Sequence, residues 1–154
     1  MLYVIHIATI HIIVSKFNSM SIFQKIVDWN NERGLLEQGF DYTKEVSFIV
    51  EELLESTGKF DSVTARNEAT RFATEMVGKA SVDEEKVVDA FADIIVFASG
   101  AIAKLGYDPT KVMDEVYTEI NSRSGELREG KFVKDPQAIL YTADLKSCRY
   151  SEEE

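Results

Sequence analysis

Two clusters of acidic residues stand inside helical patterns that are otherwise apolar. The first lies in the run Glu51-Glu52-Leu53-Leu54-Glu55, and the second in Asp89-Ala90-Phe91-Ala92-Asp93. Glu52 and Glu55 are spaced i, i+3 and the two aspartates i, i+4, so each pair lines one side of its helix. Like charges at this spacing repel, and burying them unpaired is costly. Two such pairs facing each other would form a four-carboxylate site, an oxygen-rich set suited to Mg²⁺.

Two simpler explanations compete with a metal site. A solvated helix face explains an isolated Glu-Glu pair well, but the turns that follow Asp93 meet Phe97 and Ala101 in place of polar residues. Alternatively, the two aspartates form ion pairs with basic residues of the preceding helical segment. The candidates for that role are Arg66, Arg71 and Lys79. Both alternatives stay open at this level.

A group of basic residues follows the last helical segment. Arg123, Arg128, Lys131 and Lys134 lie within twelve positions, shortly after Asn121, although the chain has 17 basic and 27 acidic residues. These residues are either ordinary surface charges or donors to an anion. A metal site with amide, guanidinium and ammonium donors nearby suits a polyphosphate, because phosphate oxygens bind both metal ions and charged donors.

Composition narrows the class of protein and its partners. A length of 154 residues fits one domain with a sizeable core. The net charge of −10 argues against nonspecific binding to DNA or RNA duplexes, which requires basic surface. Cys148 is the only cysteine, so an intrachain disulfide is excluded and a cytoplasmic location is expected.

The first residues form an apolar extension. Leu2 to Val14 is too short to span a bilayer and no basic residue precedes it, so we expect no membrane association. The segment is an added strand or helix at a subunit contact, or a translated upstream segment if the natural start is Met20. We therefore expect an extension over 1–20, one domain over 21–145 and an acidic tail over 146–154.

The remaining pattern predicts five helices and no convincing strand before the tail. The fold class is therefore all-α, a four- to five-helix bundle with a short irregular or hairpin C-terminal tail that turns at Glu129-Gly130. Ser21 with Gln24 and Ser81 with Glu84 have the spacing of capping boxes, and Asp108-Pro109 places a cap before a proline at the first helical position. The expected helices cover about 22–33, 43–56, 62–77, 82–104 and 109–122.

The acidic motifs resemble those of the MazG-type all-α nucleoside triphosphate pyrophosphohydrolases, a superfamily marked by Glu-x-x-Glu on one helix and Glu-x-x-Asp on a later one. Glu52-Leu53-Leu54-Glu55 is similar to the first motif, with Glu51 as an additional acid, and Asp93 is similar to the closing aspartate. Ala90 stands where the second glutamate is expected, and Asp89 precedes it. This Asp-Ala-x-x-Asp form resembles the phosphoribosyl-ATP pyrophosphohydrolase-like branch.

The segment after the fifth helix extends the resemblance to roughly residues 22–140. Asn121, Arg123 and Gly130-Lys131-Phe132-Val133-Lys134 are similar to the Asn, Lys and Gly-Lys-x-x-Lys of that branch, with Arg123 in place of the usual Lys. Phe97 stands one turn after the closing aspartate, where a Tyr is common. The occurrence of these motifs in this order indicates the family more specifically than any single motif does.

The resemblance implies a bundle of the all-α NTP pyrophosphatase type and cleavage of a nucleoside triphosphate between its α and β phosphates. It implies Mg²⁺ as cofactor, with Mn²⁺ as an alternative ion, a small-molecule nucleotide as substrate, and a homodimer or homotetramer. Glu52, Glu55, Asp89 and Asp93 would hold the metal, and Glu51 or Glu55 would be the base that orients water. The substrate-binding residues would be Asn121, Arg123, Lys131, Lys134, Phe97 and Trp29, although Trp29 is equally suited to packing.

Two other functions compete with catalysis. A non-catalytic nucleotide-binding or regulatory helical protein would keep the scaffold without turnover, and Ala90 favours it because alanine cannot bind a metal. A carboxylate-bridged di-iron bundle is the third interpretation, but such sites usually add Glu-x-x-His pairs, and neither His6 nor His11 has that spacing.

Overall fold

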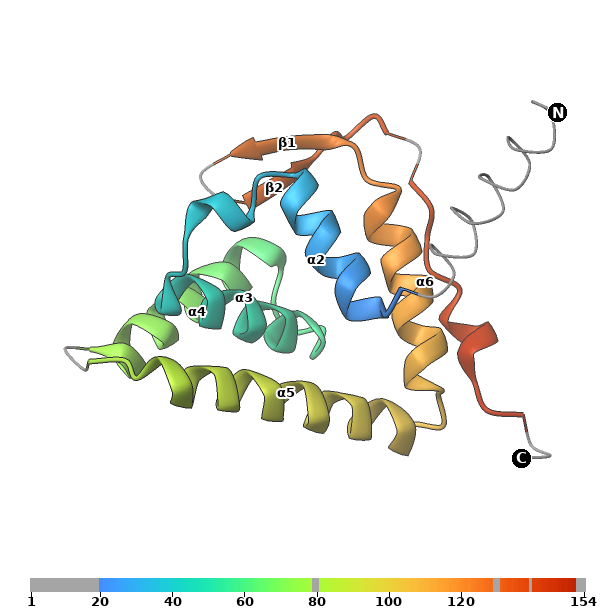
Figure 1. The fold of residues 1–154 in the computed structure, drawn as a ribbon, viewed down its shortest axis with the longest axis horizontal. Coiled ribbons are helices and arrows are strands. Elements are labelled where there is room, and N and C mark those ends of the chain that lie inside the picture. The colour runs from blue at the N-terminus through green and yellow to red at the C-terminus, as the bar shows by residue number, and fades with distance from the viewer. Residues whose placement is uncertain (1–19, 79–80, 129–130, 139, 152–154) are drawn as a thin grey trace, which may run out of the picture. The chain divides into compact units, whose positions relative to one another are not determined.

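The computed structural model describes residues 20–78, 81–128, 131–138 and 140–151, and of Lys131 the backbone alone. Within this part the chain is mostly helical and has one small antiparallel sheet (Figure 1). It divides into two compact units. The central unit is Gly39–Ala98, and the terminal unit combines the residues up to Gln38 with those from Ser99 onward.

The central unit is built on two helices that pack side by side, α3 (Tyr42–Glu55) and α4 (Ser62–Val77) (Figure 1). Each begins at an aspartate whose carboxylate accepts a backbone N–H of the first turn: Asp41 from Lys44 at 3.1 Å and Asp61 from Thr64 at 2.8 Å. Their contact is lined by the alanines of α4, which recur every four residues and are fully buried. These are Ala65, Ala69 and Ala73.

The longest helix is α5 (Glu84–Lys104), whose first fifteen residues belong to the central unit. Phe91 joins it to the start of that unit, because its ring meets the edge of Phe40 at a centroid distance of 6.3 Å. Val87 is the buried residue of this helix. Among the described residues no helix combines the length and the apolar character needed to cross a membrane.

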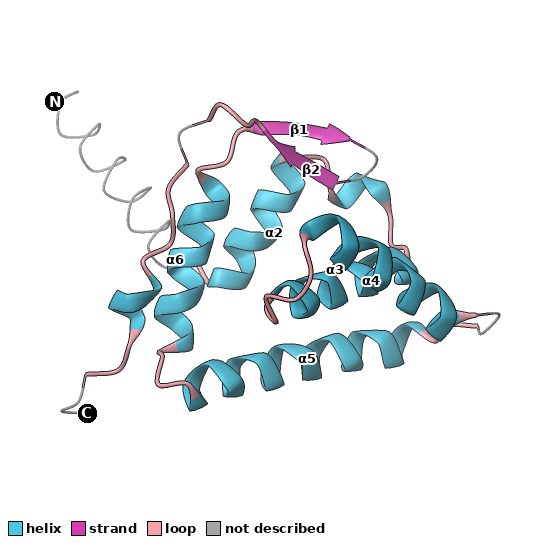
Figure 2. Ribbon diagram, turned by 180° about the vertical axis from the view of Figure 1, so that it is seen from behind, coloured by secondary structure: helices cyan, strands magenta, loops and turns pink. Residues whose placement is uncertain are grey.

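The terminal unit pairs α2 (Ile22–Glu32) with α6 (Pro109–Asn121). Lys25 and Asp114 form an ion pair between the two helices at 3.3 Å. A hairpin of β1 (Gly125–Arg128) and β2 (Lys131–Lys134) follows α6, in a register that pairs Gly125 with Lys134 (Figure 2). Two short 3₁₀ helices complete the unit, η1 (Leu36–Gln38) and η2 (Leu145–Cys148).

Two glutamates of α6 hold the C-terminal segment. The Glu115 carboxylate accepts the Tyr141 hydroxyl at 2.6 Å and the Asp144 backbone N–H at 3.0 Å. One turn later, Glu119 accepts the Ala143 backbone N–H at 3.0 Å. Because charged acceptors make the stronger hydrogen bonds, these three contacts fasten the segment to the helix.

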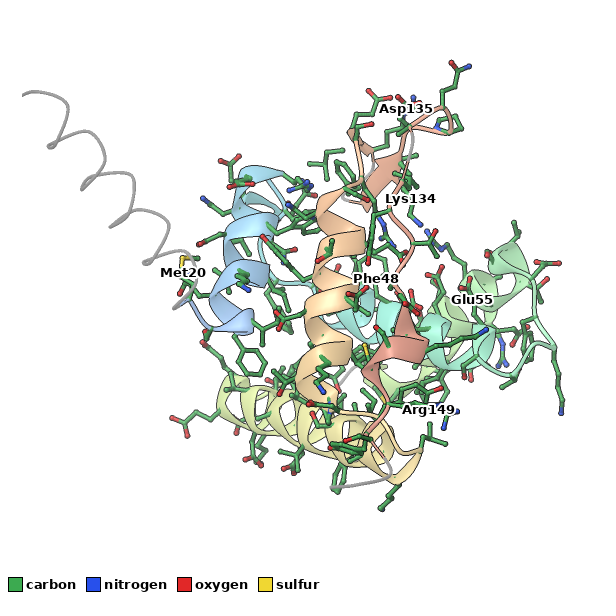
Figure 3. The ribbon with its side chains drawn as sticks, turned by 90° about the vertical axis from the view of Figure 1, so that its right-hand side faces the viewer. Met20, Phe48, Glu55, Lys134, Asp135 and Arg149 are labelled. Atoms are coloured by element: carbon green, nitrogen blue, oxygen red, sulfur yellow. The ribbon has the colours of Figure 1, made fainter. Side chains whose placement is uncertain are left out.

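Further contacts fix the end of this segment beside the start of α6. The Asp108 backbone N–H donates to the Cys148 carbonyl at 2.9 Å, and Cys148 is buried. Arg149, labelled in Figure 3, lies with its guanidinium 4.6 Å from the centre of the Tyr107 ring. The residues up to Tyr150 are therefore part of the folded unit.

These carboxylates predict a loss of stability in acid. Hydrogen bonds from Tyr141 and from the Asp144 backbone hold the pKa of Glu115 below its ordinary value of 4.5. The backbone N–H of Ala143, followed by Arg123, lowers the pKa of Glu119 in the same way. A depressed folded-state pKa gives stability that is complete above the unfolded pKa and is lost as pH falls through the folded value.

We therefore expect the midpoint of thermal unfolding to fall as pH decreases below about 4.5. The Glu115→Gln/Glu119→Gln variant should melt at a lower temperature at neutral pH and show a shallower acid dependence. Circular dichroism melts between neutral pH and about pH 3 would measure both. Glu37→Gln, an exposed glutamate of η1, is the control. A double variant whose acid dependence equals that of wild type would contradict the assignment.

All five expected helices are confirmed, with bounds that differ from the expected ones by at most two residues. Asp83 caps α5, because its carboxylate accepts the backbone N–H groups of Glu85 and Lys86 at 3.1 and 3.4 Å. The capping box expected at Ser81 is therefore wrong, since the helix begins after Asp83, whose negative charge also complements the helix dipole. Ser21 does cap α2 at 3.2 Å.

The mostly helical fold is confirmed, and the more specific bundle type stays a prediction. The expected hairpin pairs as β1 and β2, while its turn at 129–130 lies outside the described residues. The extension over 1–19 and the end of the tail over 152–154 also lie outside them. The expected domain limits at 21 and 145 stay a prediction.

Candidate functional site

Glu51 is the buried member of the first acidic cluster. Its carboxylate accepts two hydrogen bonds from the guanidinium of Arg66 on α4, from Nη2 at 2.5 Å and from Nε at 3.1 Å. This two-point geometry is the strong form of an Arg-carboxylate pair. Glu51 thus connects α3 to α4, and a carboxylate held in this way is poorly placed to orient a water molecule. Its role as the base stays a prediction. Glu55 is the better-placed candidate, because it has no ion pair among the described residues.

The other four acids are accessible to solvent. On α3, Glu52 is exposed and Glu55, labelled in Figure 3, is half-buried. On α5, Asp89 and Asp93 are both exposed. None of these four side chains has an ion pair or a hydrogen bond with another described residue. They are therefore available to a cation from solution.

Ion pairing with α4 does not explain the two aspartates. Arg66 binds Glu51, and Arg71 binds Glu68 at 2.7 Å and Glu75 at 3.0 Å on its own helix. The third candidate, Lys79, lies outside the described residues. The two arginines that were candidates for this role are thus occupied by glutamates.

The four acids do not converge within one chain. Among the residues that the structure describes, no three His, Cys, Asp or Glu side chains lie together in a group that could hold a metal ion. The donor chemistry nevertheless fits Mg²⁺, since all four are carboxylates and Mg²⁺ prefers oxygen ligands. The predicted four-carboxylate site stays a prediction.

Several predicted substrate-binding residues gather in the terminal unit, around the end of α6. Arg123 is half-buried and bonds Glu119 at 2.9 Å, while its Nε is buried without a hydrogen-bond partner among the described residues. Lys134 is exposed on β2 and, after Ala143 and Arg123, also contributes to the lowered pKa of Glu119. Asn121 is the last residue of α6 and is exposed.

Trp29 is a packing residue that links α2 to α6 and to the hairpin. Its indole N–H donates to the Ile120 carbonyl at 3.1 Å, and its ring meets Phe132 edge-on at 5.8 Å. The guanidinium of Arg33 lies over both rings, 4.3 Å from the centre of Trp29 and 5.3 Å from that of Phe132. Because the indole N–H of Trp29 is already bonded to the protein, only the face of its ring is left to contact a nucleotide.

The remaining two predicted residues lie elsewhere. Lys131 begins β2, opposite Arg128, and its side chain lies outside the described residues. Phe97 belongs to the central unit and is 72% exposed on α5. Each unit therefore carries part of the predicted site: the acids and Phe97 in the central unit, and Trp29, Asn121, Arg123 and Lys134 in the terminal unit.

Glu119 was missed by sequence reasoning, although a signal was present. It stands four residues before Arg123, which is the spacing of an ion pair along a helix.

Comparison of the chain with protein-family models, with curated proteins and with solved structures finds no match.

Proposed function

We propose that this chain is a Mg²⁺-dependent nucleoside triphosphate pyrophosphohydrolase, which converts an NTP, a dNTP or a related nucleotide to the monophosphate and pyrophosphate. One observation carries the proposal. Two helices of one compact unit present Glu52 with Glu55 and Asp89 with Asp93 to solvent, without a cationic partner among the described residues. These are the residues on which the resemblance to MazG-type enzymes depends.

The chemistry assigns a role to each group of residues. Glu52, Glu55, Asp89 and Asp93 would hold Mg²⁺, which when bound supplies charge neutralisation at the phosphate oxygens and polarises water. Glu55, half-buried and not committed to an ion pair in the described chain, is the favoured base, because Glu51 is held by Arg66.

The phosphate-binding residues that the resemblance implies lie in the terminal unit. Lys134 is exposed and offers a charged donor without an ion pair among the described residues. Arg123 keeps donors beyond the one that bonds Glu119, since a guanidinium carries five N–H groups. Asn121 adds an exposed amide at the end of α6. Such donors stabilise the charge that develops on the oxygens during phosphoanhydride cleavage.

A non-catalytic nucleotide-binding protein is the second candidate. It is favoured by Ala90, which stands on α5 where a metal-binding glutamate is expected and whose methyl group cannot bind a metal. The di-iron interpretation has no support in the described chain, and His6 and His11 lie outside it.

A substrate panel separates the first two candidates. We expect pyrophosphate release from at least one member of a set of NTPs and dNTPs in the presence of Mg²⁺, and loss of that release in EDTA. Replacing Mg²⁺ with Mn²⁺ should restore part of it. Nucleotide binding by calorimetry without turnover of any member would instead support the non-catalytic protein.

A further inference from the structure

Glu119 of α6 uses both of its carboxylate oxygens. Oε1 accepts a hydrogen bond from Nη2 of Arg123 at 2.9 Å, and Oε2 accepts the backbone N–H of Ala143 at 3.0 Å. All three residues belong to the terminal unit. A carboxylate that is bonded at both oxygens is held in one orientation, and it holds the guanidinium of Arg123 with it.

The segment that contains Ala143 is attached on both sides of this residue. Before it, the Tyr141 backbone N–H donates to Oγ of Ser122 at 3.0 Å. After it, the Asp144 backbone N–H donates to the Glu115 carboxylate at 3.0 Å. The Ala143 N–H is therefore a donor in a fixed position, and it restrains the carboxylate that accepts it.

The backbone of Arg123 is fixed as well. Its N–H donates to the Ile120 carbonyl at 3.2 Å, and the same oxygen accepts the Trp29 indole N–H at 3.1 Å. Within the part of the chain that the structure describes, Glu119 is the one acceptor bonded to the Arg123 guanidinium. A guanidinium carries five N–H groups, so the bond to Glu119 leaves donors for an anion.

Glu119 has two effects of opposite sign on an anion that binds Arg123. Its negative charge repels the anion, but this charge is already compensated, because the Ala143 N–H, then Arg123 and finally Lys134 lower the pKa of Glu119. Its bond to Arg123 removes rotamer freedom that a loose arginine would lose on binding, a loss that weakens binding by up to about tenfold. We expect the second effect to dominate.

We propose that Glu119 is a positioning residue, which holds the Arg123 guanidinium in place for the phosphates of the substrate and is itself held by the Ala143 backbone. This role rests on the proposed function, in which Arg123 binds phosphate. The segment around Ala143 thus supports the phosphate-binding residues, although it lies beyond residues 22–140, over which the family resemblance extends.

Binding of inorganic tripolyphosphate to the full chain in EDTA tests the positioning without Mg²⁺-dependent turnover. Glu119→Gln keeps the size of the side chain but has a single acceptor oxygen, so it cannot accept from Arg123 and Ala143 together. We expect the dissociation constant measured by calorimetry to rise about tenfold. If repulsion dominated, removing the charge would instead tighten binding. Unchanged or tighter binding by Glu119→Gln, or a wild type that does not bind tripolyphosphate, would overturn the proposal.

Glu115→Gln is the matched control. Glu115 lies one turn earlier on α6 and holds the same segment through Tyr141 and Asp144, but in the described chain it has no bond to Arg123. We expect this variant to melt at a lower temperature and to bind tripolyphosphate as wild type does, when both are measured well below their unfolding midpoints. A loss of affinity as large as that of Glu119→Gln would show that attachment of the segment decides the affinity, and would overturn the positioning role.

A second variant keeps the negative charge of Glu119. In Glu119→Asp the side chain is shorter by one carbon–carbon bond, about 1.5 Å, so its carboxylate cannot reach both Arg123 and Ala143. We expect weaker tripolyphosphate binding here too, with the net charge of the chain unchanged. This variant decides the question if Glu119→Gln fails to fold, and wild-type affinity in Glu119→Asp would contradict the positioning role.

A double-mutant cycle separates positioning from a general structural effect. A residue that acts through Arg123 has nothing to position once Arg123 is replaced. Glu119→Gln should therefore weaken tripolyphosphate binding about tenfold in the wild-type background and should not weaken that of Arg123→Gln any further. A loss of the same size in both backgrounds would show that Glu119 acts on the fold in general, and the proposal would be overturned.

Nucleotide hydrolysis separates this proposal from the proposed function. With the best nucleotide of the panel and Mg²⁺, kcat/KM should follow the same pattern across the variants as the affinity for tripolyphosphate. If the binding pattern is found but no nucleotide is hydrolysed, the positioning role is upheld and the proposed function fails. If wild type and Glu119→Gln hydrolyse a nucleotide with equal kcat/KM, the positioning role fails and the proposed function is upheld.

Discussion

Asp93→Asn is expected to reduce Mg²⁺-dependent pyrophosphate release at least about a hundredfold. Asp93 is the acid of α5 on which charge pattern and family resemblance agree, and asparagine removes its negative charge at nearly constant size. Because the side chain is exposed on α5 and has no hydrogen bond to a described residue, the fold should be unaffected. Initial rates of pyrophosphate release from the best nucleotide of the panel would measure the loss of activity. Far-ultraviolet circular dichroism would show whether the helical content is unchanged.

Glu85→Gln is the matched control for this variant. It removes one exposed carboxylate from the same helix, outside both acidic motifs. We expect it to retain most of the wild-type rate. If Asp93→Asn kept full activity, the metal site would be assigned to the wrong residues. If both variants lost activity equally, the effect would reflect the overall charge of α5 and not a specific ligand.

Arg66→Ala is expected to destabilise the protein by about 2–3 kcal/mol, which corresponds to a decrease of roughly 5–10 °C in the unfolding midpoint. Removing one member of a buried pair leaves the other charge buried and uncompensated. Here the Glu51 side chain is 8% exposed, while that of Arg66 is 42% exposed, so we expect less than the full cost of a deeply buried pair. Thermal and urea unfolding followed by circular dichroism would measure the change.

Arg71→Ala provides the comparison on the same helix. Arg71 bonds Glu68 and Glu75, but all three side chains are well exposed, and ion pairs of this kind contribute little to stability. The double variant Glu51→Leu/Arg66→Met should recover most of the stability lost in Arg66→Ala, because it removes both buried charges together. Equal effects of Arg66→Ala and Arg71→Ala would show that the Glu51 pair has no special structural role.

The same double variant also tests the catalytic role of Glu51. If it folds and still releases pyrophosphate, Glu51 is not the base, and Glu55 becomes the remaining candidate of the first motif. If it folds without activity while Glu55→Gln stays active, the result supports Glu51 as the base.

The helices of this protein follow from local features of the sequence. Asp108 caps α6 and Pro109 occupies its first position, as expected, and Asp61 caps α4 in the same way. These features act within one turn, so a short window of sequence contains the whole interaction. The start of α5 was misplaced, because Asp83, two residues after Ser81, caps the helix.

The sequence by itself also determined the chemistry available to the site: two pairs of carboxylates, one per helix, and a basic segment after α6. Only the tertiary structure decided which of these groups are committed to the fold. Glu51 bonds Arg66 across fifteen positions and Trp29 bonds Ile120 across ninety-one, whereas Glu52, Glu55, Asp89 and Asp93 stay accessible. The physical reason is that pairing between distant residues depends on how helices pack, and spacing along one helix carries no information about the neighbour it meets.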